Sequence, residues 1–506
     1  MNRNHPSPFA TLKTSDGFLG PLWRGTMQSL LDRPREDGFC QTSFGEENGV
    51  KCYGVCHYSR DAAEAAGVLA DQGCPEPAAR ILDFTLSHIP EGQYFIVHAY
   101  RPDGTPLHNK IQIDTPAHPA RALARLLETG ADDPALPRCF DRLDRVFDDT
   151  WRHHFHAAFR LLDSGNYNEQ LGGGTEPLLD LFTNGAMYGG CLAMAEAARL
   201  LNRPAIVTER YLERAAQLDR GIDHWLYDPA ADLYRAALRP DGKAEERPLN
   251  WINLYPERWY PGRRSAWRRA FEELWRAEHC NDWGGLRVPS GETGFMKLRT
   301  MGKVIGQMLR FAARSGDDRR LEVLLEFLRR TVRRPADLYP EYWLHHLPSP
   351  GQSPYLDWFF GEFEGVWNGF AEDPAADYTV DSGNCEQCAV FLGCFSGDVL
   401  GFSAGGGKVE AAPRLPGTAV AEVRNRALGV HRGRRVAGGF RLDAHELEFT
   451  AEAPVEELTL TLPFYAGEAP APVGCEPPEA EVKLDERGAT AVFRNVSSAR
   501  LTRLKG

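Results

Sequence analysis

The chain has 506 residues, of which 42% are hydrophobic and 25% charged, and it carries a formal net charge of −12. This composition is ordinary for a globular protein and excludes wholesale disorder, while the length exceeds one ordinary hydrophobic core. The acidic, interspersed charges exclude the basic footprint that nucleic acid or an anionic membrane requires, so the expected partner is a small neutral molecule.

The first residues predict no export. Residues 1–18 contain no apolar core segment and no small-residue cleavage site, so we expect no secretory signal and a cytoplasmic protein. No apolar run is long enough for a helix that crosses a membrane. The eleven cysteines are an odd number, and several fall in apolar helical pattern, which favours buried reduced thiols over a disulfide framework. The sequence leaves a homo-oligomer open.

Helical periodicity dominates from about residue 24 to residue 397. We expect helices at Arg24–Leu31, Ser59–Gly73, Glu76–Ile89, Pro119–Thr129, Arg138–Leu161, Asn184–Leu201, Thr208–Leu226, Arg264–Cys280, Thr300–Arg314, Asp317–Arg333 and Cys385–Phe395. Ser59 is the expected N-cap of the second helix and Gly73 its stop signal. Because no heptad seam recurs, these helices predict a globular helical array.

The pattern changes after Gly401. We predict a hinge at Ser403–Gly407, followed by short segments in which hydrophobic and polar residues alternate. The strands expected there are Thr418–Val423, Glu446–Thr450, Leu458–Leu462 and Ala489–Phe493. Alternation with turns between the segments predicts an antiparallel sandwich of about 100 residues. We assign it a structural role because it contains few clusters of aromatic residues or carboxylates.

Two stretches combine residues that suit a sugar site. Tyr58, Ser59, Arg60 and Asp61 stand at a helix start, where the Arg–Asp pair can hold two sugar hydroxyls or the acid can complement the helix dipole. Residues 165–179 form a long, glycine-rich loop that includes Tyr167 and Glu169. A carboxylate in such a loop before a buried helix can serve as a general acid with a raised pKa, or it can face solvent.

The second long loop, residues 334–384, is dense in aromatic residues and carboxylates. Glu341, Trp343, Gln352 and Trp358 suit a sugar ring, whose faces stack on aromatic side chains while its hydroxyls hydrogen-bond, although the tryptophans can also pack the loop onto the protein. Glu386 at the next helix start is a catalytic or sugar-binding group or a dipole partner. Asp114 is a further candidate for binding the sugar.

Metal and cofactor sites are not expected. Cys385 and Cys388 have the Cys-x-x-Cys spacing, but no second pair stands at ligand spacing and no histidine is near. The sequence shows no phosphate loop, no nucleophile elbow and no dinucleotide fingerprint.

Three stretches together resemble the six-hairpin glycosidases, and most closely their glucoamylase-like branch. They are Tyr-Ser-Arg-Asp from residue 58, Asn-Tyr-Asn-Glu-Gln from residue 166 and Leu-Tyr-Pro-Glu-Tyr-Trp from residue 338. The segment Gly397–Pro416 is similar to the link from such barrels into an all-β domain. The resemblance implies a mainly α fold class, an (α/α)6 helical barrel with a small C-terminal antiparallel β-sandwich domain. The implied domains are a catalytic barrel at 1–400 and the sandwich at 401–506.

The resemblance also implies site roles. Glu169 falls at the general acid, Glu341 at the general base, and Arg60 and Asp61 at the pair that grips the innermost sugar. The chain departs from the pattern around the acid, where Gln170 and Asn168 replace an acidic residue and a tryptophan. After the base, the expected Trp-Ser-His-like helix is replaced by Trp358-Phe-Phe-Gly-Glu-Phe-Glu. Glu386 is therefore the second candidate for the base.

The function that follows is a glycoside hydrolase acting on an oligosaccharide or glycoside by an inverting mechanism, without metal or cofactor. A sugar phosphorylase is an alternative, but it would need a basic phosphate pocket that the motifs do not supply. A lyase or epimerase working with His57, His118 or His153 and a tyrosine is another. A helical toroid that binds glycans without catalysis is the non-enzymatic alternative.

Overall fold

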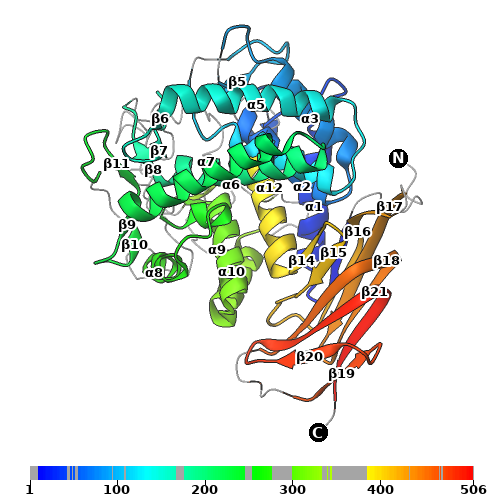
Figure 1. Ribbon diagram of the computed structural model, residues 1–506. Coiled ribbons are helices and arrows are strands. Elements are labelled where there is room, and N and C mark those ends of the chain that lie inside the picture. The colour runs from blue at the N-terminus through cyan, green and yellow to red at the C-terminus, as the bar shows by residue number, and fades with distance from the viewer. Residues whose placement is uncertain are drawn as a thin grey trace.

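In this computed structural model, helices fill one part of the molecule and a large sheet lies beside them (Figure 1). The structure describes residues 10–42, 46–47, 50–51, 55–93, 95–107, 110–166, 176–245, 253–275, 299–332, 339, 342–344, 384–431, 434–465, 468 and 471–504. Within these ranges no helix is both long and apolar enough to cross a membrane.

Most helices of the helical part begin and end close to the residues that the hydrophobic periodicity predicts. Its helices are α1 (Leu19–Asp32), α2 (Ser59–Asp71), α3 (Pro75–Ser87), α4 (Ala117–Glu128), α5 (Ala135–His154), α6 (Leu181–Leu200), α7 (Ala205–Gly221), α8 (Arg264–Leu274), α9 (Gly302–Ser315), α10 (Asp318–Thr331) and α12 (Cys385–Cys394). Short helical turns are η2 (Ile222–Leu226), η4 (Tyr255–Arg258) and η8 (Phe395–Val399). The predicted helix Arg138–Leu161 is too long, because the chain leaves α5 at His154 for a small hairpin.

Six elements contact one another in a closed ring, in the order α2, α4, α6, η4, α9 and α12. α3, α5 and α7 pack outside α2, α4 and α6, while α1 packs on α12 and α10 on α9. The composition of α2 explains its inner position. Of its 13 residues 11 are buried, and five of the buried residues are alanines. Small side chains let neighbouring helices approach from several sides.

The nine-stranded sheet has the order β1-β16-β17-β18-β15-β14, with β21 also pairing with β18 and both β19 and β20 pairing with β21. Its strands are β1 (Thr11–Thr14), β14 (Phe402–Gly405), β15 (Lys408–Ala411), β16 (Val420–His431), β17 (Arg434–Asp443), β18 (Glu446–Pro463), β19 (Val473–Glu476), β20 (Glu481–Leu484) and β21 (Gly488–Arg503). β15 runs parallel to β18, and the other pairs are antiparallel.

Two-stranded ladders connect loops of the helical part. They are β2 (Glu46–Glu47) with β3 (Val50–Lys51), β4 (His57–Tyr58) with β5 (Ala99–Tyr100), β6 (Phe155–His156) with β7 (Leu161–Leu162), β8 (Leu179–Asp180) with β11 (Ala237–Leu238), β9 (Tyr227–Asp228) with β10 (Leu233–Tyr234), and β12 (Arg299–Met301) with β13 (Tyr342–Leu344). Three of these ladders, β4–β5, β8–β11 and β12–β13, end at the start of α2, α6 and α9 respectively.

The predicted fold class, a mainly α (α/α)6 barrel with a small antiparallel β-sandwich, is wrong. Besides its helices, the part of the chain that the structure describes has one large curled mixed sheet in its C-terminal region. Alternation of hydrophobic and polar residues indicates only that one face of a strand is buried. The same alternation arises in one curved sheet and in two stacked sheets, so it does not distinguish them. In the helical ring, one position is held by the four-residue turn η4 and not by a full helix.

The predicted hinge at Ser403–Gly407 is also wrong. This stretch lies in the β14–β15 hairpin, whose turn carries Gly406 and Gly407, both with positive φ. Glycine adopts such backbone angles without a steric penalty, so the glycines that suggested a linker make a tight turn inside the sheet.

Candidate functional site

The candidate site lies where the ring helices begin. Arg60 is the second residue of α2, Lys303 of α9 and Glu386 of α12. Asp114 lies three residues before the first residue of α4, and Asp180 is the N-cap residue of α6. Direct contacts among Arg60, Asp114, Lys303 and Glu386 bring the starts of α2, α4, α9 and α12 together at one end of the ring, and the guanidinium of Arg60 lies over Phe182 in the first turn of α6. Helix N-termini favour negative charge there, because their free N–H groups and dipoles point at it.

A chain of buried ion pairs joins four of these residues. Lys303 Nζ lies 3.2 Å from Glu386 Oε2, and Arg60 Nε lies 3.6 Å from Glu386 Oε1. On its other side, Arg60 Nη1 donates a 3.1 Å hydrogen bond to Asp114 Oδ2. The four side chains are between 4% and 6% exposed. Each charge thus has an opposite charge at hand, as the desolvation cost of burial requires.

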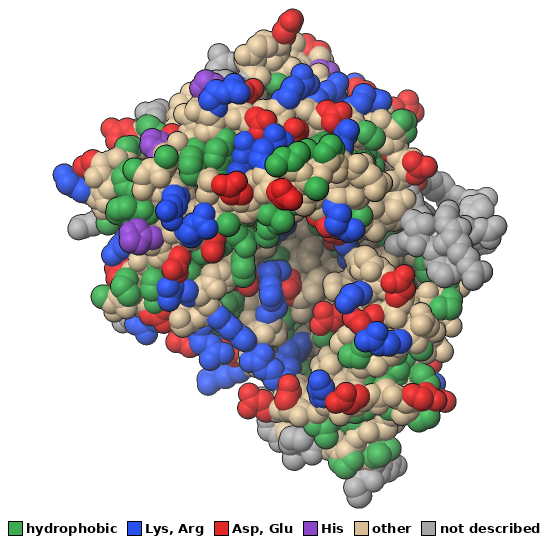
Figure 2. All heavy atoms as spheres, in the orientation of Figure 1, with side chains coloured by type: hydrophobic (Ala, Val, Ile, Leu, Met, Phe, Trp, Pro, Cys, Tyr) green, Lys and Arg blue, Asp and Glu red, His purple; other side chains and the backbone are tan. Residues whose placement is uncertain are grey.

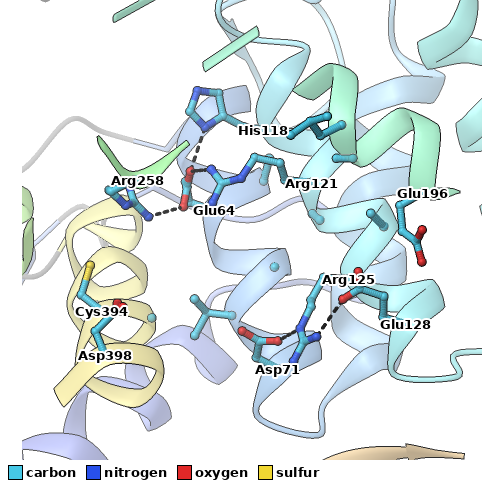
Figure 3. A pocket seen from close by; sticks show the side chains of 18 of the residues that line it. Glu64, Asp71, His118, Arg121, Arg125, Glu128, Glu196, Arg258, Cys394 and Asp398 are labelled. Carbon is cyan, nitrogen blue, oxygen red and sulfur yellow. Dashed lines mark hydrogen bonds and ion pairs between the residues drawn. The ribbon is translucent and has the colours of Figure 1, made fainter. Parts of the chain in front are cut away.

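The same network continues along α2 and α4. His118 lies one turn after Asp114, with its Nε2 3.3 Å from Asp114 Oδ2 and its Nδ1 2.8 Å from Glu64 Oε1. Glu64 also accepts hydrogen bonds of 3.0 Å from Arg121 and 3.1 Å from Arg258 (Figure 3). The buried charge network therefore comprises Lys303, Glu386, Arg60, Asp114, His118, Glu64, Arg121 and Arg258.

The protein shifts the titration of its buried acids in opposite directions. Burial would raise the pKa of Asp114, but Arg60 and His118 outweigh it and hold this pKa at about 2. Burial would also raise the pKa of Glu64, but Arg258, Arg121 and His118 outweigh this effect and hold the pKa well below its usual value. For Asp180 the balance is reversed: burial and the nearby charge of Asp114 outweigh its hydrogen bonds with Thr183 and raise its pKa to about 7. Such divergent environments are typical of functional sites.

The structure brings together four of the sequence-predicted residues. Arg60, Asp114 and Glu386 are in direct contact, and buried Asp61 follows Arg60 in the first turn of α2. Arg60 also lies over the ring of Phe182, 5.8 Å from its centroid. Tyr58, half-buried at the end of β4, packs edge-on against His98 with the ring centroids 4.9 Å apart.

The other predicted site residues fall largely outside the described part of the chain. These are Glu169, Tyr167, Glu341, Gln352 and Trp358, while Trp343 is described as a backbone position in β13. The described residues that flank them in sequence are held close to the helix starts. The backbone of Gln112 pairs with that of Gly165, and the Ile111 N–H donates a 2.7 Å hydrogen bond to Asn166 Oδ1. This fixes the chain before Tyr167 beside the segment that leads to Asp114.

A second pair of flanking residues lies beside α9. Tyr339 is fully buried, its hydroxyl donates a 2.8 Å hydrogen bond to the Gly302 carbonyl, and its ring stacks on Phe391. Tyr342 pairs with Met301 in the β12–β13 ladder. Both residues that bracket Glu341 in sequence therefore contact the start of the helix that carries Lys303.

Sequence reasoning missed Lys303, Glu64 and Arg258, and it named His118 only for a rival function. Lys303 carried a usable signal, because a lysine buried in the apolar stripe of a helix needs an acidic partner. The other two histidines of that rival lie elsewhere. His57 is buried, accepts a hydrogen bond from the Cys40 N–H and is hydrogen-bonded to the Thr85 hydroxyl. Burial, together with His88, lowers the pKa of His57 to about 3. His153 is exposed.

A cavity of about 440 Å³ lies further along the same helices (Figure 3). Most of its walls come from α2, α4 and α6 and from α12 and η8, with Arg258 of η4 and Arg310 of α9. Glu64, His118, Arg121 and Arg258 belong both to this cavity and to the network. Arg125, between Asp71 and Glu128, lines it too. It is therefore displaced toward the opposite end of the helices from Arg60 and Glu386. In the described part of the chain, no group of three or more His, Cys, Asp or Glu is placed to hold a metal ion.

Solved structures of glycosidases are similar to this chain. A GH78 family rhamnosidase of Bacillus sp. GL1 gives a TM-score of 0.61 at 14% identity, over 90% of this chain and 43% of that chain. An α-L-rhamnosidase from Dictyoglumus thermophilum gives 0.60 at 12% identity, over 98% and 50%. A glycosidase variant in complex with glucose gives 0.54 at 14% identity, over 74% and 95%.

These matches concern the fold. Comparison with known protein families and with curated proteins finds no match. The chain spans half of the length of the rhamnosidases or less, but it covers most of the shorter glycosidase. The structural neighbours of this protein are glycoside hydrolases, with which it shares its fold at 12–14% sequence identity.

Proposed function

We propose that the protein is a glycoside hydrolase that cleaves a glycosidic bond by a single displacement with inversion at the anomeric carbon. The observation that carries the proposal is the convergence of Arg60, Asp114, Lys303 and Glu386 at one end of the helical ring. Its fold neighbours, named as rhamnosidases and glycosidases, support a carbohydrate substrate. In this proposal residues 1–400 carry the catalytic groups, and 401–506 form a separate domain that contributes none.

Glu169 is the proposed general acid. Asn166, three residues earlier in sequence, is held beside the segment that leads to Asp114. A protonated carboxylic acid would donate to the glycosidic oxygen while the bond to the anomeric carbon breaks. The leaving sugar then departs as a neutral alcohol.

Glu341 is the proposed general base, ahead of Glu386. A base must offer a lone pair to the attacking water. Both oxygens of Glu386 already face cations, Arg60 at 3.6 Å and Lys303 at 3.2 Å, and the side chain is almost fully buried. This favours a role for Glu386 in holding the two cations in place. Glu341 lies in sequence between Tyr339 and Tyr342, which both contact the start of α9.

In an inverting enzyme the acid and base carboxyls stand roughly 6.5–9.5 Å apart, which leaves room for one water on the face opposite the leaving group. Arg60, Asp61 and Asp114 are the proposed ligands of the sugar hydroxyls, since Arg60 offers several donors and the carboxylates accept. Tyr58, Tyr167, Trp343, Gln352 and Trp358 are proposed to complete the sugar site.

Hydrolysis of a panel of aryl glycosides and oligosaccharides tests this function, with rhamnosides and glucosides included because the fold neighbours act on or bind such sugars. Proton NMR during early turnover should show a product of inverted anomeric configuration. Net retention would instead require a nucleophile and carboxyls about 5–5.5 Å apart. Sugar binding without any turnover would mean that the protein is a carbohydrate-binding protein and not an enzyme.

A further inference from the structure

A second cavity, of about 540 Å³, lies outside the ring between η4, α8, α9 and the turn from β20 to β21. It shares Arg258 with the buried charge network, but its walls differ in chemistry from those of the candidate site. Five arginines and a single glutamate line it: Arg258, Arg264, Arg310, Arg314, Arg487 and Glu257. The arginines come from separate parts of the chain, so the tertiary fold has gathered them.

Three of these arginines have acidic partners. Arg258 pairs with Glu64 at 3.1 Å, and Arg310 Nε lies 3.0 Å from Glu257 while its Nη1 lies 2.8 Å from Asp398. Arg314 reaches the same two acids more loosely, at 3.4 Å from Glu257 and 4.0 Å from Asp398. Five guanidinium groups therefore share three carboxylates.

Arg264 and Arg487 account for the difference. Within the described part of the chain, neither has a carboxylate within ion-pair distance, and Arg487 donates a weak 3.4 Å hydrogen bond to the Arg314 carbonyl. An excess of two positive charges in a chain of net charge −12 is a local reversal of sign. Figure 2 shows Lys and Arg side chains gathered at this face, around the lower end of α10 and beside the sheet.

The site is built and not a loose patch. Arg258 is 8% exposed and Arg310 17%, and both are fixed by their acids. Trp267 forms part of the wall, held by a 2.9 Å hydrogen bond from its Nε1 to the Pro261 carbonyl, and Phe311 forms another part. The volume is in the range of small-molecule sites. Guanidinium groups match the oxygens of phosphate with two parallel hydrogen bonds, and a phosphate dianion would neutralise the two excess charges.

We propose that this arginine cavity binds a phosphate group, either as the free ion or as the monoester of a sugar-sized molecule. Arg264 from α8 and Arg487 from the β20–β21 turn supply the two uncompensated charges, and Arg314 closes the third side. The ligand would bridge the helical part and the sheet, because its contacts come from both. This site does not depend on the proposed hydrolysis.

Calorimetric titration of the full chain at low salt tests the proposal, with inorganic phosphate, glucose 6-phosphate and glucose as separate ligands. We expect both phosphates to bind with a dissociation constant of about 1 mM or lower, and glucose not to compete. Arg264→Gln and Arg487→Gln should each weaken phosphate binding by about tenfold. Arg268→Gln removes an exposed charge from the same helix but lies outside the cavity, so it should leave binding unchanged.

Tighter binding of glucose 6-phosphate than of inorganic phosphate would support a sugar phosphate as the ligand, and equal binding would support the free ion. The proposal is overturned if neither phosphate binds, or if Arg264→Gln and Arg487→Gln bind phosphate as the unmodified protein does. Neither failure would bear on glycoside hydrolysis, which is measured separately.

Discussion

Glutamine matches glutamate in shape, so Glu169→Gln removes an acidic proton and keeps the volume of the side chain. If Glu169 is the general acid, the rate should fall by about 10²–10⁴ on natural glycosides and by less on aryl glycosides with good leaving groups. Steady-state rates on both substrate types check this. Glu176→Gln is the matched control, because Glu176 is an exposed acid in the later part of the same loop. Full activity of Glu169→Gln on a natural glycoside would remove this residue from the mechanism.

The base is tested by deleting each candidate carboxylate and supplying a small anion. Glu341→Ala should abolish hydrolysis and recover activity in azide or formate, which can enter the vacated space. Glu386→Ala should not be rescued, and it should lower the free energy of unfolding by about 3–5 kcal/mol because Lys303 and Arg60 lose their buried partner. Rate measurements with and without azide, together with urea unfolding, separate the two outcomes. Rescue of Glu386→Ala alone would reverse the ranking.

At the residue scale, the sequence identified single charged residues of the site but not their ion-pair partners. Arg60 and Asp61 stood out because two charged residues at a helix start need a reason, and Glu386 stood out likewise. What each of them contacts was not predictable. Glu386 and Lys303 come from helices separated by the long loop, and Arg60 comes from the far end of the helical region. A charge in a sequence shows that a partner is needed, but distance in space decides which partner it has.

At the scale of the elements, the close approach of α4 and α6 depends on a missing side chain. A Cβ atom at Gly190 would lie 2.8 Å from Cα and Cβ of Ala117. Gly190→Ala should therefore cost about 1–3 kcal/mol of stability, since backbone must move to admit the methyl group. Urea unfolding followed by circular dichroism measures this cost.

Gly67 in α2 gives the opposite expectation, because a Cβ there would meet Ala122 at 3.8 Å or more. Gly67→Ala should raise stability by about 0.5–1 kcal/mol through helix propensity alone. Equal effects of the two substitutions would mean that contact with α4 does not limit residue 190.

The N-cap of α6 should make stability depend on pH. Burial and then the charge of Asp114 raise the pKa of Asp180 from 3.8 to about 7, so the folded protein holds a proton that the unfolded chain releases. The contribution of this group is therefore full below about pH 4 and is lost as the pH rises to 7. Asp114 titrates in the opposite sense and at lower pH, because its pKa is held at about 2.

Asp180→Asn keeps an oxygen that can accept the 2.7 Å hydrogen bond from the Thr183 N–H but cannot ionise. The free energy of unfolding of the variant, minus that of the unmodified protein, should therefore be more favourable at pH 8 than at pH 5. Urea midpoints at the two pH values give this difference. Asp317→Asn, at the partly exposed N-cap of α10, controls for loss of a capping charge. An equal change at both pH values for Asp180→Asn would contradict the assignment.

Caps also show where local patterns mislead. Ser59 was expected to cap α2, but it is the first helical residue, and its hydroxyl donates to the Val97 carbonyl. The serine fixes the segment beside α2, while Tyr58 occupies the cap position without a side-chain hydrogen bond. A hydroxyl near a helix start predicts a local bond, and tertiary contact can supply a better acceptor.

At the scale of the whole molecule, β1 joins the first residues to the sheet at the other end of the chain. Leu12 is fully buried in β1 and pairs with Val423 of β16, and β1 also contacts α1. Leu12→Ala should cost about 2–5 kcal/mol, because a cavity would open where helices and sheet meet. Lys13→Ala, on the exposed side of the same strand, should stay within about 0.5 kcal/mol. A loss below about 1 kcal/mol for Leu12→Ala in urea unfolding would show that β1 contributes little.

The sequence by itself determined the helices, because burial on one face imprints a period of 3.6 residues that local reading detects. It also determined that strands follow Gly401, and that Arg60, Asp61 and Glu386 stand at helix starts. Only the tertiary structure decided that these strands form one curled sheet that takes in β1, and that η4 replaces a full helix in the ring. It alone linked Lys303 to Glu386 and gathered five arginines around one cavity. Periodicity records which side of an element is buried, whereas the identity of its neighbours depends on contacts between distant parts of the chain, which leave no local pattern.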